Sequence, residues 1–323
     1  MSNKEVYKKT LIFSVRSLLL SLISLTLFVA CCWLGYTIME KVNNKGLIGL
    51  GIGAVIAIII AALISHFFAY ALKAAQIAMI TKAVTEDELP DDVYHEGIRV
   101  VKERFTTVAA FFFVTGIIKG IFRQIGNLIT GAGKALGGDT GESIAGVISG
   151  IIQVLIAYLC DCCLGWVFYR SDQPATRATC EGAVIFFKNG KTLLRNMGRI
   201  FGMGLLSFVG IVAAFTGIFY LIFSNFNAAF SSLAAEIVEA AERMGETVPA
   251  FFTDPNNLSL IAAALVAVFI WNIIHGTFVR PFVLTGVIRN YMEAGVKNIP
   301  SESDFGILDS KSPKFAKLHR ELS

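Results

Sequence analysis

The stretch "IAYLCDCCLGWVFYR", from Ile156 to Arg170, decides between a soluble core and a membrane helix. It places Asp161 among three cysteines in a run that is otherwise mostly apolar. Over the whole chain, 55% of residues are hydrophobic and 16% are charged, with a mean hydropathy of +0.66. A soluble domain has about 45–50% apolar and about 25% charged residues, so this composition predicts an integral membrane protein.

The three cysteines, Cys160, Cys162 and Cys163, are predicted to pack as small apolar side chains. On one helix they point to different sides, so they cannot all bind one metal ion from this segment. The sequence contains neither paired CxxC motifs nor the Cys/His spacing of zinc sites. We therefore expect no metal, no cofactor and no enzymatic activity. The net charge of +4 gives no indication of nucleic acid binding.

Six stretches are apolar enough to cross a bilayer, which takes about 20 residues. The predicted spans are Ile12–Met39, Leu47–Leu72, Phe105–Phe122, Ser143–Tyr169, Ile200–Phe223 and Leu258–Val279. The last of these is expected to continue past Pro281 to about Ala294. The predicted fold class is all-α: one polytopic helical membrane domain with interfacial amphipathic helices and a cytoplasmic tail at residues 295–323.

The basic residues indicate the orientation, because Lys and Arg collect on cytoplasmic flanks. They concentrate in four segments: the N-terminus, the stretch after the second span, the stretch after the fourth span, and the tail. The loop from Ser224 to Asn257 instead has Arg243 as its one basic residue. Alternation over six spans puts both termini in the cytoplasm, with the chain in the cell membrane. Lys119, Arg123 and Lys134 are then exceptions on the outer side.

Four connecting segments have amphipathic patterns. Asp91–Arg104 and Phe226–Met244 are predicted to be helices, the second ending near Gly245. Residues 119–138 suit either an interfacial helix or, because of their glycines, a flexible or re-entrant loop. Thr179–Arg199 is predicted to lie along the inner leaflet, with Glu181 on its polar face.

Asp161 is the clearest candidate for a functional residue, because a charged side chain in hydrocarbon costs about 2.5–3.5 kcal/mol on insertion scales. Its carboxylate could pair with a cationic substrate, a metal ion or a proton. The alternative is that it pairs with a Lys, Arg or His of a neighbouring helix or reaches the wet inner surface. Tyr158 and Trp166 are aromatic residues of the kind that surround organic cations. One helix face cannot hold all three residues, so other helices would have to complete such a site.

The polar residues of the second and sixth spans are weaker candidates. His66 lies in the second span, and Asn272 and His275 share one face of the sixth. Such polar groups must face protein or a water-filled cavity. They either line a pathway or form interhelical hydrogen bonds that hold the bundle.

The segment "KNGKTLLRNMGRI" (Lys188–Ile200) resembles the cytoplasmic elbow helix of the choline transporter-like family. The likeness includes a later "GVIRNYMEAG" (Gly286–Gly295) at the end of the last long helix. Where the family has acidic residues there, this sequence has Arg280 and Arg289. The matching elbow positions are Lys188, Asn189, Leu193, Leu194, Arg195, Asn196 and Arg199. The resemblance implies a solute-transporting or pore-like bundle with a quaternary amine substrate such as choline.

Two functional hypotheses follow. The first is a transporter or channel for a small cationic solute. The second is a non-transporting membrane scaffold or a subunit of a membrane complex. In either case the expected partners are the lipid bilayer and either further copies of this chain or other membrane proteins.

Overall fold

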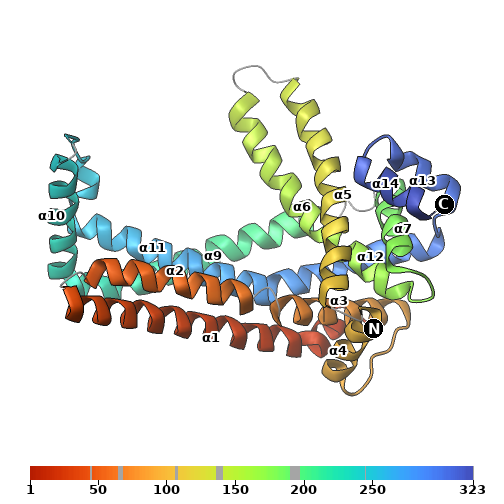
Figure 1. The fold of residues 1–323 in the computed structure, drawn as a ribbon, viewed down its shortest axis with the longest axis horizontal. Helices are drawn as coiled ribbons and strands as arrows, with labels where there is room; N and C mark the ends of the chain where they lie inside the picture. Colours follow the sequence, from red (N-terminus) through yellow and green to blue (C-terminus); the bar gives the residue numbers. More distant parts are fainter. Residues whose placement is uncertain are drawn as a thin grey trace. The chain divides into compact units, whose positions relative to one another are not determined.

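The computed structural model describes residues 1–43, 46–64, 68–105, 108–135, 141–189, 197–243 and 245–322 (Figure 1). Within these ranges the chain forms helices and no strand, so the predicted all-α class is confirmed. The chain divides into two compact units, which are described separately below. Unit 1 comprises Met1–Gly198 with Pro281–Ser323, and unit 2 comprises Arg199–Arg280.

Unit 1 contains most of the helices. They are α1 (Asn3–Asn43), α2 (Gly46–Ile64), α3 (Tyr70–Thr85), α4 (Val93–Arg104), α5 (Val108–Ala135), α6 (Gly141–Tyr169), α7 (Ala175–Lys188), α12 (Arg280–Lys297), α13 (Glu302–Asp309) and α14 (Pro313–Leu322). Unit 2 is built around a pair of long helices. Its elements are α9 (Met197–Phe223), η2 (Ser224–Phe226), α10 (Asn227–Arg243), η3 (Ala250–Phe252), α11 (Pro255–Ile274) and the π-helical turn η4 (His275–Val279).

Three helical stretches of the described chain are long and apolar enough to cross a membrane. They are Asn3–Val42, Gly198–Arg243 and Pro255–Lys297. Two further apolar helical stretches, Ile48–Ile64 and Gln153–Tyr169, are shorter. The prediction of a helical membrane protein is therefore confirmed, and the count of six spans stays a prediction. Pro255–Lys297 includes Pro281, so the sixth predicted span does continue past that residue as helix.

Several helix ends follow the local sequence signals. α4 begins after Asp92, whose side chain accepts a hydrogen bond from the His95 backbone N–H. α10 ends at Arg243, and Gly245 after it has φ +74°, which suits glycine at a helix C-terminus. Both helices lie where the amphipathic patterns predicted them.

Glycines let α1 and α2 pack closely against each other in unit 1. A Cβ atom added to Gly49 would collide with the Gly35 carbonyl, and one added to Gly53 would collide with the Cys31 carbonyl. In lipid there is no hydrophobic force between helices, so apolar helices associate through close packing. Small residues allow the backbones to approach closely enough for this. The outer faces of both helices remain covered with exposed apolar side chains, as a lipid-facing hairpin requires.

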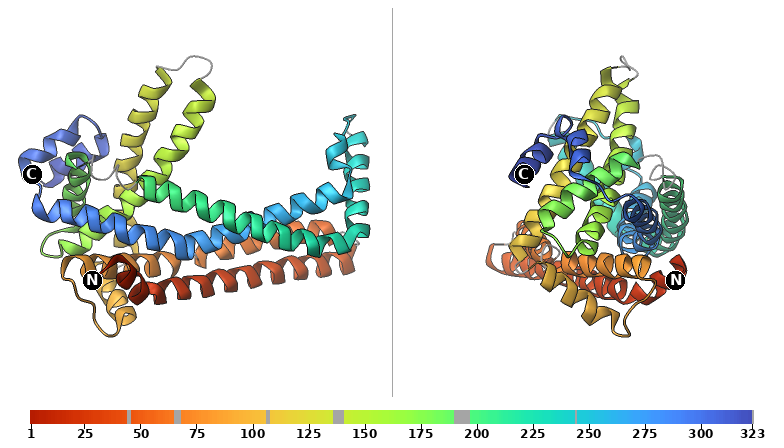
Figure 2. Two further views of the ribbon diagram at one scale, coloured as in Figure 1. Left: turned by 180° about the vertical axis from the view of Figure 1, so that it is seen from behind. Right: turned by 90° about the vertical axis from the view of Figure 1, so that its right-hand side faces the viewer.

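The rest of unit 1 is a bundle whose helices bury one another on several sides. α3 is buried from Ala74 to Ala83, α6 from Tyr158 to Phe168, and α7 from Ala178 to Ile185. The start of α1 also joins the bundle, with Val6 and Phe13 buried. Figures 1 and 2 show both chain termini in this same region of unit 1. Residues 158–168 therefore have protein around them, although their composition is that of a membrane span.

The predicted cytoplasmic tail is folded. Residues 295–323 contain α13 and α14, which pack against α7 and bury Phe305, Leu308 and Phe315. A capping box at Ser301 starts α13, with Asp304 as its acidic partner. These apolar residues pack on a helix that is distant in the sequence, and the cytoplasmic location of the tail stays a prediction.

We predict that Gly49→Ala destabilises the α1–α2 hairpin by about 1–3 kcal/mol, because the added methyl group forces two backbones apart. Thermal unfolding of the purified protein in detergent measures the effect. Gly51→Ala is the matched control, since a Cβ atom there meets nothing within 4 Å. The control should be neutral or slightly stabilising, given that Gly costs about 1 kcal/mol relative to Ala in a helix. Equal effects of the two changes would contradict close packing at Gly49.

Candidate functional site

Asp161 forms an ion pair with Lys73 of α3. The Lys73 Nζ lies 2.7 Å from Asp161 Oδ1, and the side chain of Asp161 is only 7% exposed. Lys73 is more open, at 37% exposed, so its ammonium group is partly hydrated. Of the two alternatives for this carboxylate, the structure contains the pairing with a lysine of a neighbouring helix.

Trp166 has a structural role in the bundle. Its indole Nε1 donates a hydrogen bond of 3.0 Å to Glu181 Oε2 on α7. The same oxygen accepts a 2.9 Å bond from Nη1 of Arg170, at the end of α6. Glu181 was predicted on the polar face of a surface helix, and this was wrong, because its side chain is 4% exposed. α7 is covered by protein, and this acid is satisfied by a tryptophan and an arginine.

Tyr158 is buried on α6 with Asp161 and Trp166. The three residues thus lie on one helix and inside one bundle. The indole N–H of Trp166 is already bonded to Glu181, and Asp161 is already paired with the ammonium group of Lys73. A role of the three residues in holding a cationic solute stays a prediction.

The polar residues of the sixth predicted span meet others within unit 2. His275 Nδ1 and Ser207 Oγ share a hydrogen bond of 3.1 Å, and Trp271 Nε1 donates to the same oxygen at 3.3 Å. His275 begins the π-helical turn η4, a distortion that is common at functional sites. Asn272 instead donates to its own helix, at the carbonyl of Val268. His66, predicted in the second span, lies outside the described residues.

The cysteines of the Ile156–Arg170 stretch are packing residues. Cys162 and Cys163 are fully buried on α6, and Cys180 is fully buried on α7. Burial raises the pKa of Cys180 to about 12, so this thiol stays protonated at neutral pH. In the described part of the chain, no group of three or more His, Cys, Asp or Glu side chains could hold a metal ion.

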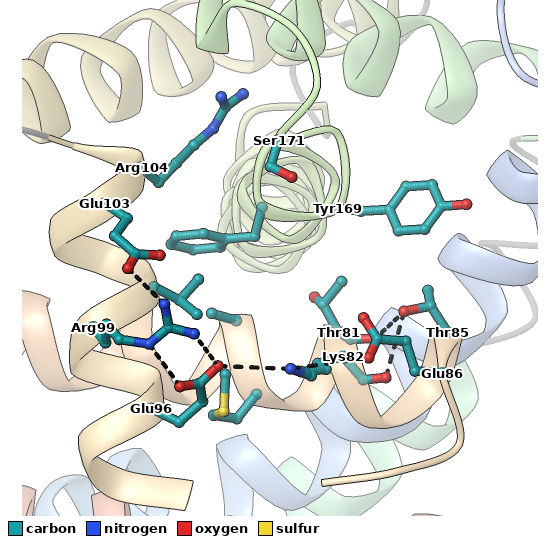
Figure 3. Close-up of a pocket in the computed structure, with 14 residues that line it drawn as sticks. Thr81, Lys82, Thr85, Glu86, Glu96, Arg99, Glu103, Arg104, Tyr169 and Ser171 are labelled. Atoms are coloured by element: carbon teal, nitrogen blue, oxygen red, sulfur yellow. Dashed lines mark hydrogen bonds and ion pairs between the residues drawn. The ribbon is translucent and has the colours of Figure 1, made fainter. Parts of the chain in front are cut away.

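A charged cleft of about 460 Å³ lies between α3, α4 and the end of α6 (Figure 3). On one wall, Arg99 contacts two glutamates, with Nη2 2.7 Å from Glu96 and Nη1 2.5 Å from Glu103. Lys82 Nζ approaches Glu96 from α3 at 3.6 Å. The hydrogen bonds from Arg99 hold the pKa of Glu96 below its usual value, so the glutamate is ionised at neutral pH. The cleft thus presents fixed charges of both signs.

Arg104 joins this cleft to the turn that follows α6. Its Nη1 donates to the Gln173 carbonyl at 2.9 Å, and its Nη2 donates to the Arg170 carbonyl at 3.0 Å. Carbonyls at a helix C-terminus lack partners within the helix, and a cation there is favourable. Arg104 therefore positions the far wall of the cleft, where Ser171 lies.

No protein-family model, no curated protein and no solved structure matches the chain. The resemblance to the choline transporter-like family therefore stays a prediction. Of its elbow motif, Lys188, Asn189 and Arg199 are described, whereas Leu193, Leu194, Arg195 and Asn196 lie outside the described residues.

We predict that Lys73→Met destabilises the protein by about 3 kcal/mol, because it leaves the Asp161 carboxylate buried without a partner. The double variant Lys73→Met with Asp161→Asn should recover much of this loss, since it removes both charges. Denaturant unfolding in detergent provides the measurement. Lys317→Met is the control, because the Lys317–Glu321 pair is well exposed and such pairs contribute about 0–1 kcal/mol. A Lys73→Met loss no larger than that of the control would contradict a buried pair.

Proposed function

We propose that this protein is a non-transporting membrane scaffold, in which apolar hairpins anchor a helical bundle at the cytoplasmic face. The proposal rests on one observation. All four segments that the basic residues mark as cytoplasmic contribute to the bundle of unit 1. The segments that the distribution of Lys and Arg assigns to the cytoplasm are thus the segments that belong to one unit of the structure. This agreement supports the placement of both termini on the same side of the membrane.

Contacts between these segments support the same placement. Arg289 of α12 binds the other end of the chain, with Nε 2.6 Å from Asn3 Oδ1 and Nη2 2.7 Å from the Met1 carbonyl. Lys188 of α7 lies 2.8 Å from Asp304 of α13. The first contact joins the predicted cytoplasmic N-terminus to α12, just before the tail, and the second joins the segment after the fourth span to the tail. A bundle held by such pairs needs water around its outer charges, so it belongs outside the hydrocarbon.

The scaffold is favoured over a cation transporter by the chemistry of Asp161. A solute cation would have to displace Lys73, at 2.7 Å, from a carboxylate that the bundle buries. The charged cleft beside α4 is instead open, with Glu103 and Arg99 more than half exposed. We propose that this cleft receives a polar segment of a partner protein in a membrane complex, and that the chain resides in the cell membrane.

A photo-crosslinking residue at Ser171, which lines the cleft, tests this proposal in native membranes. We expect a discrete adduct of higher mass from Ser171 and none from the matched position Ser303, which is also exposed but lies on α13. The triple change Arg99→Gln, Glu96→Gln and Glu103→Gln removes the linked charges together and should abolish the adduct. No adduct from Ser171, or equal adducts from both positions, would contradict a partner in the cleft.

Transport is the second candidate, and the cluster of His275, Ser207 and Trp271 favours it. These residues place polar groups in an apolar helix pair, beside a π-helical turn. Uptake of choline into proteoliposomes separates the two functions. The scaffold predicts no saturable uptake by the unchanged protein. Saturable uptake that Ser207→Ala or Asp161→Asn abolishes, with unfolding unchanged, would replace the scaffold by a transporter.

A further inference from the structure

The first half of α5 is part of the bundle, although it coincides with the third predicted span. Phe111, Ile118 and Ile121 are buried, and the Phe122 ring lies 5.7 Å from that of Phe186 on α7. One face of this half is therefore covered by protein, whereas Phe113 on another face is exposed. Lys119 was predicted on the outer side, yet its Nζ lies 3.1 Å from the hydroxyl of Tyr70 on α3. α3 belongs to the segments proposed as cytoplasmic.

Gln124 ties α5 to the C-terminal helices. Its Oε1 accepts a 2.5 Å hydrogen bond from Ser312 Oγ and a 3.2 Å bond from the Lys314 backbone N–H. The Lys314 side chain also covers Gly120, where a Cβ atom would come within 2.6 Å of it. At Gln124, α5 thus still contacts the start of α14, whose lysines belong in water or among lipid headgroups.

The helix that remains beyond Gln124 is too short to cross a bilayer. α5 ends at Ala135, and eleven residues at 1.5 Å each give roughly 16 Å. A bilayer core is about 30 Å thick. The returning helix α6 packs against α5 and enters the bundle at Tyr158, where its buried stretch begins. Figure 1 shows the two helices running together away from the bundle of unit 1.

The two arms are nevertheless apolar in sequence. Residues 125–135 contain one charged residue, Lys134, and residues 141–157 contain one, Glu142. Arms of this composition are expensive in water. The α6 arm, at 17 residues, is roughly 25 Å long. The shorter α5 arm limits the depth of the hairpin, and its length of roughly 16 Å matches one leaflet, about half of the hydrocarbon core. Re-entrant segments of this kind occur where the chain enters and leaves on the same side.

We infer that the α5–α6 hairpin beyond Gln124 is a re-entrant anchor, which enters only the leaflet that faces the bundle and interacts there with lipid chains. The inference rests on the cytoplasmic placement of the bundle proposed above. With this arrangement Lys119 and Arg123 lie on the same side as the other basic segments. Two of the three exceptions to the charge rule then disappear, and Lys134, near the end of α5, remains.

Cysteine labelling from each side of sealed membranes tests the hairpin. Ala135→Cys and Gly141→Cys mark its far end, and a membrane-impermeant maleimide is added outside or inside, with the unchanged protein as background. Lys4→Cys and Glu246→Cys serve as controls for the inner and outer faces. We expect labelling of Glu246→Cys from outside and none of Ala135→Cys or Gly141→Cys from outside. Outside labelling of either hairpin position would show a crossing and overturn the inference.

A fluorescent label at Gly150→Cys gives the second measurement. Gly150 has nothing within 4 Å of an added Cβ atom, so the change should not disturb folding. We expect blue-shifted emission of an attached NBD group and quenching by brominated or spin-labelled lipid. Water-like emission without lipid quenching would overturn the insertion. Labelling of Lys4→Cys and Glu246→Cys from the same face would instead refute the proposed topology of the whole chain.

Discussion

The ion pair between Lys73 and Asp161 is the constraint on which the bundle depends. The carboxylate sits in an apolar helix and cannot be left alone there, because an unpaired buried charge costs several kcal/mol. The pairing fixes α3 beside α6. Thr81 on α3 also lies against Gly165 of α6, where a Cβ atom would meet its hydroxyl at 2.7 Å. The ion pair of Asp161 and the close approach at Gly165 thus both determine how α3 and α6 pack against each other.

A second acid repeats this logic one helix further along the chain. Glu181 of α7 accepts bonds from Trp166, on the last turn of α6, and from Arg170, which directly follows α6. α6 is therefore held on one side by α3 and on another by α7. The position and rotation of an apolar helix are fixed much more closely when it has polar partners on two neighbouring helices than when it faces lipid. This explains why cysteines, which are small and apolar, fill the space between these contacts.

The sequence predicts what local signals determine. The Asp92 cap, the glycine after α10 and the continuous helix through Pro281 all follow from residues within a few positions of each feature. The partners of Asp161 and Trp166 could not be predicted in this way, since Lys73 is far away in the sequence. Glu181 did carry a signal, because it is a lone acid within the small and apolar run "ATCEGAV" (Ala178–Val184). A surface helix would have more polar neighbours around that residue.

Hydropathy separates apolar from polar segments, but it does not separate burial in lipid from burial in protein. Residues 12–39 of α1 and residues 156–169 of α6 each contain one charged residue. The α1 stretch nevertheless exposes residues such as Leu19, Ile23 and Trp33, whereas α6 from Tyr158 to Phe168 is covered by protein. The difference lies in the partners. Beyond its buried start, α1 approaches α2 closely through glycines, and many of its other side chains are exposed. α6 contains an acid and a tryptophan that need polar partners, and an arginine directly follows it. Their partners lie on α3 and α7, so these helices pack around α6. In this chain, the rare polar residues of an apolar helix therefore decide whether lipid or protein covers the apolar ones.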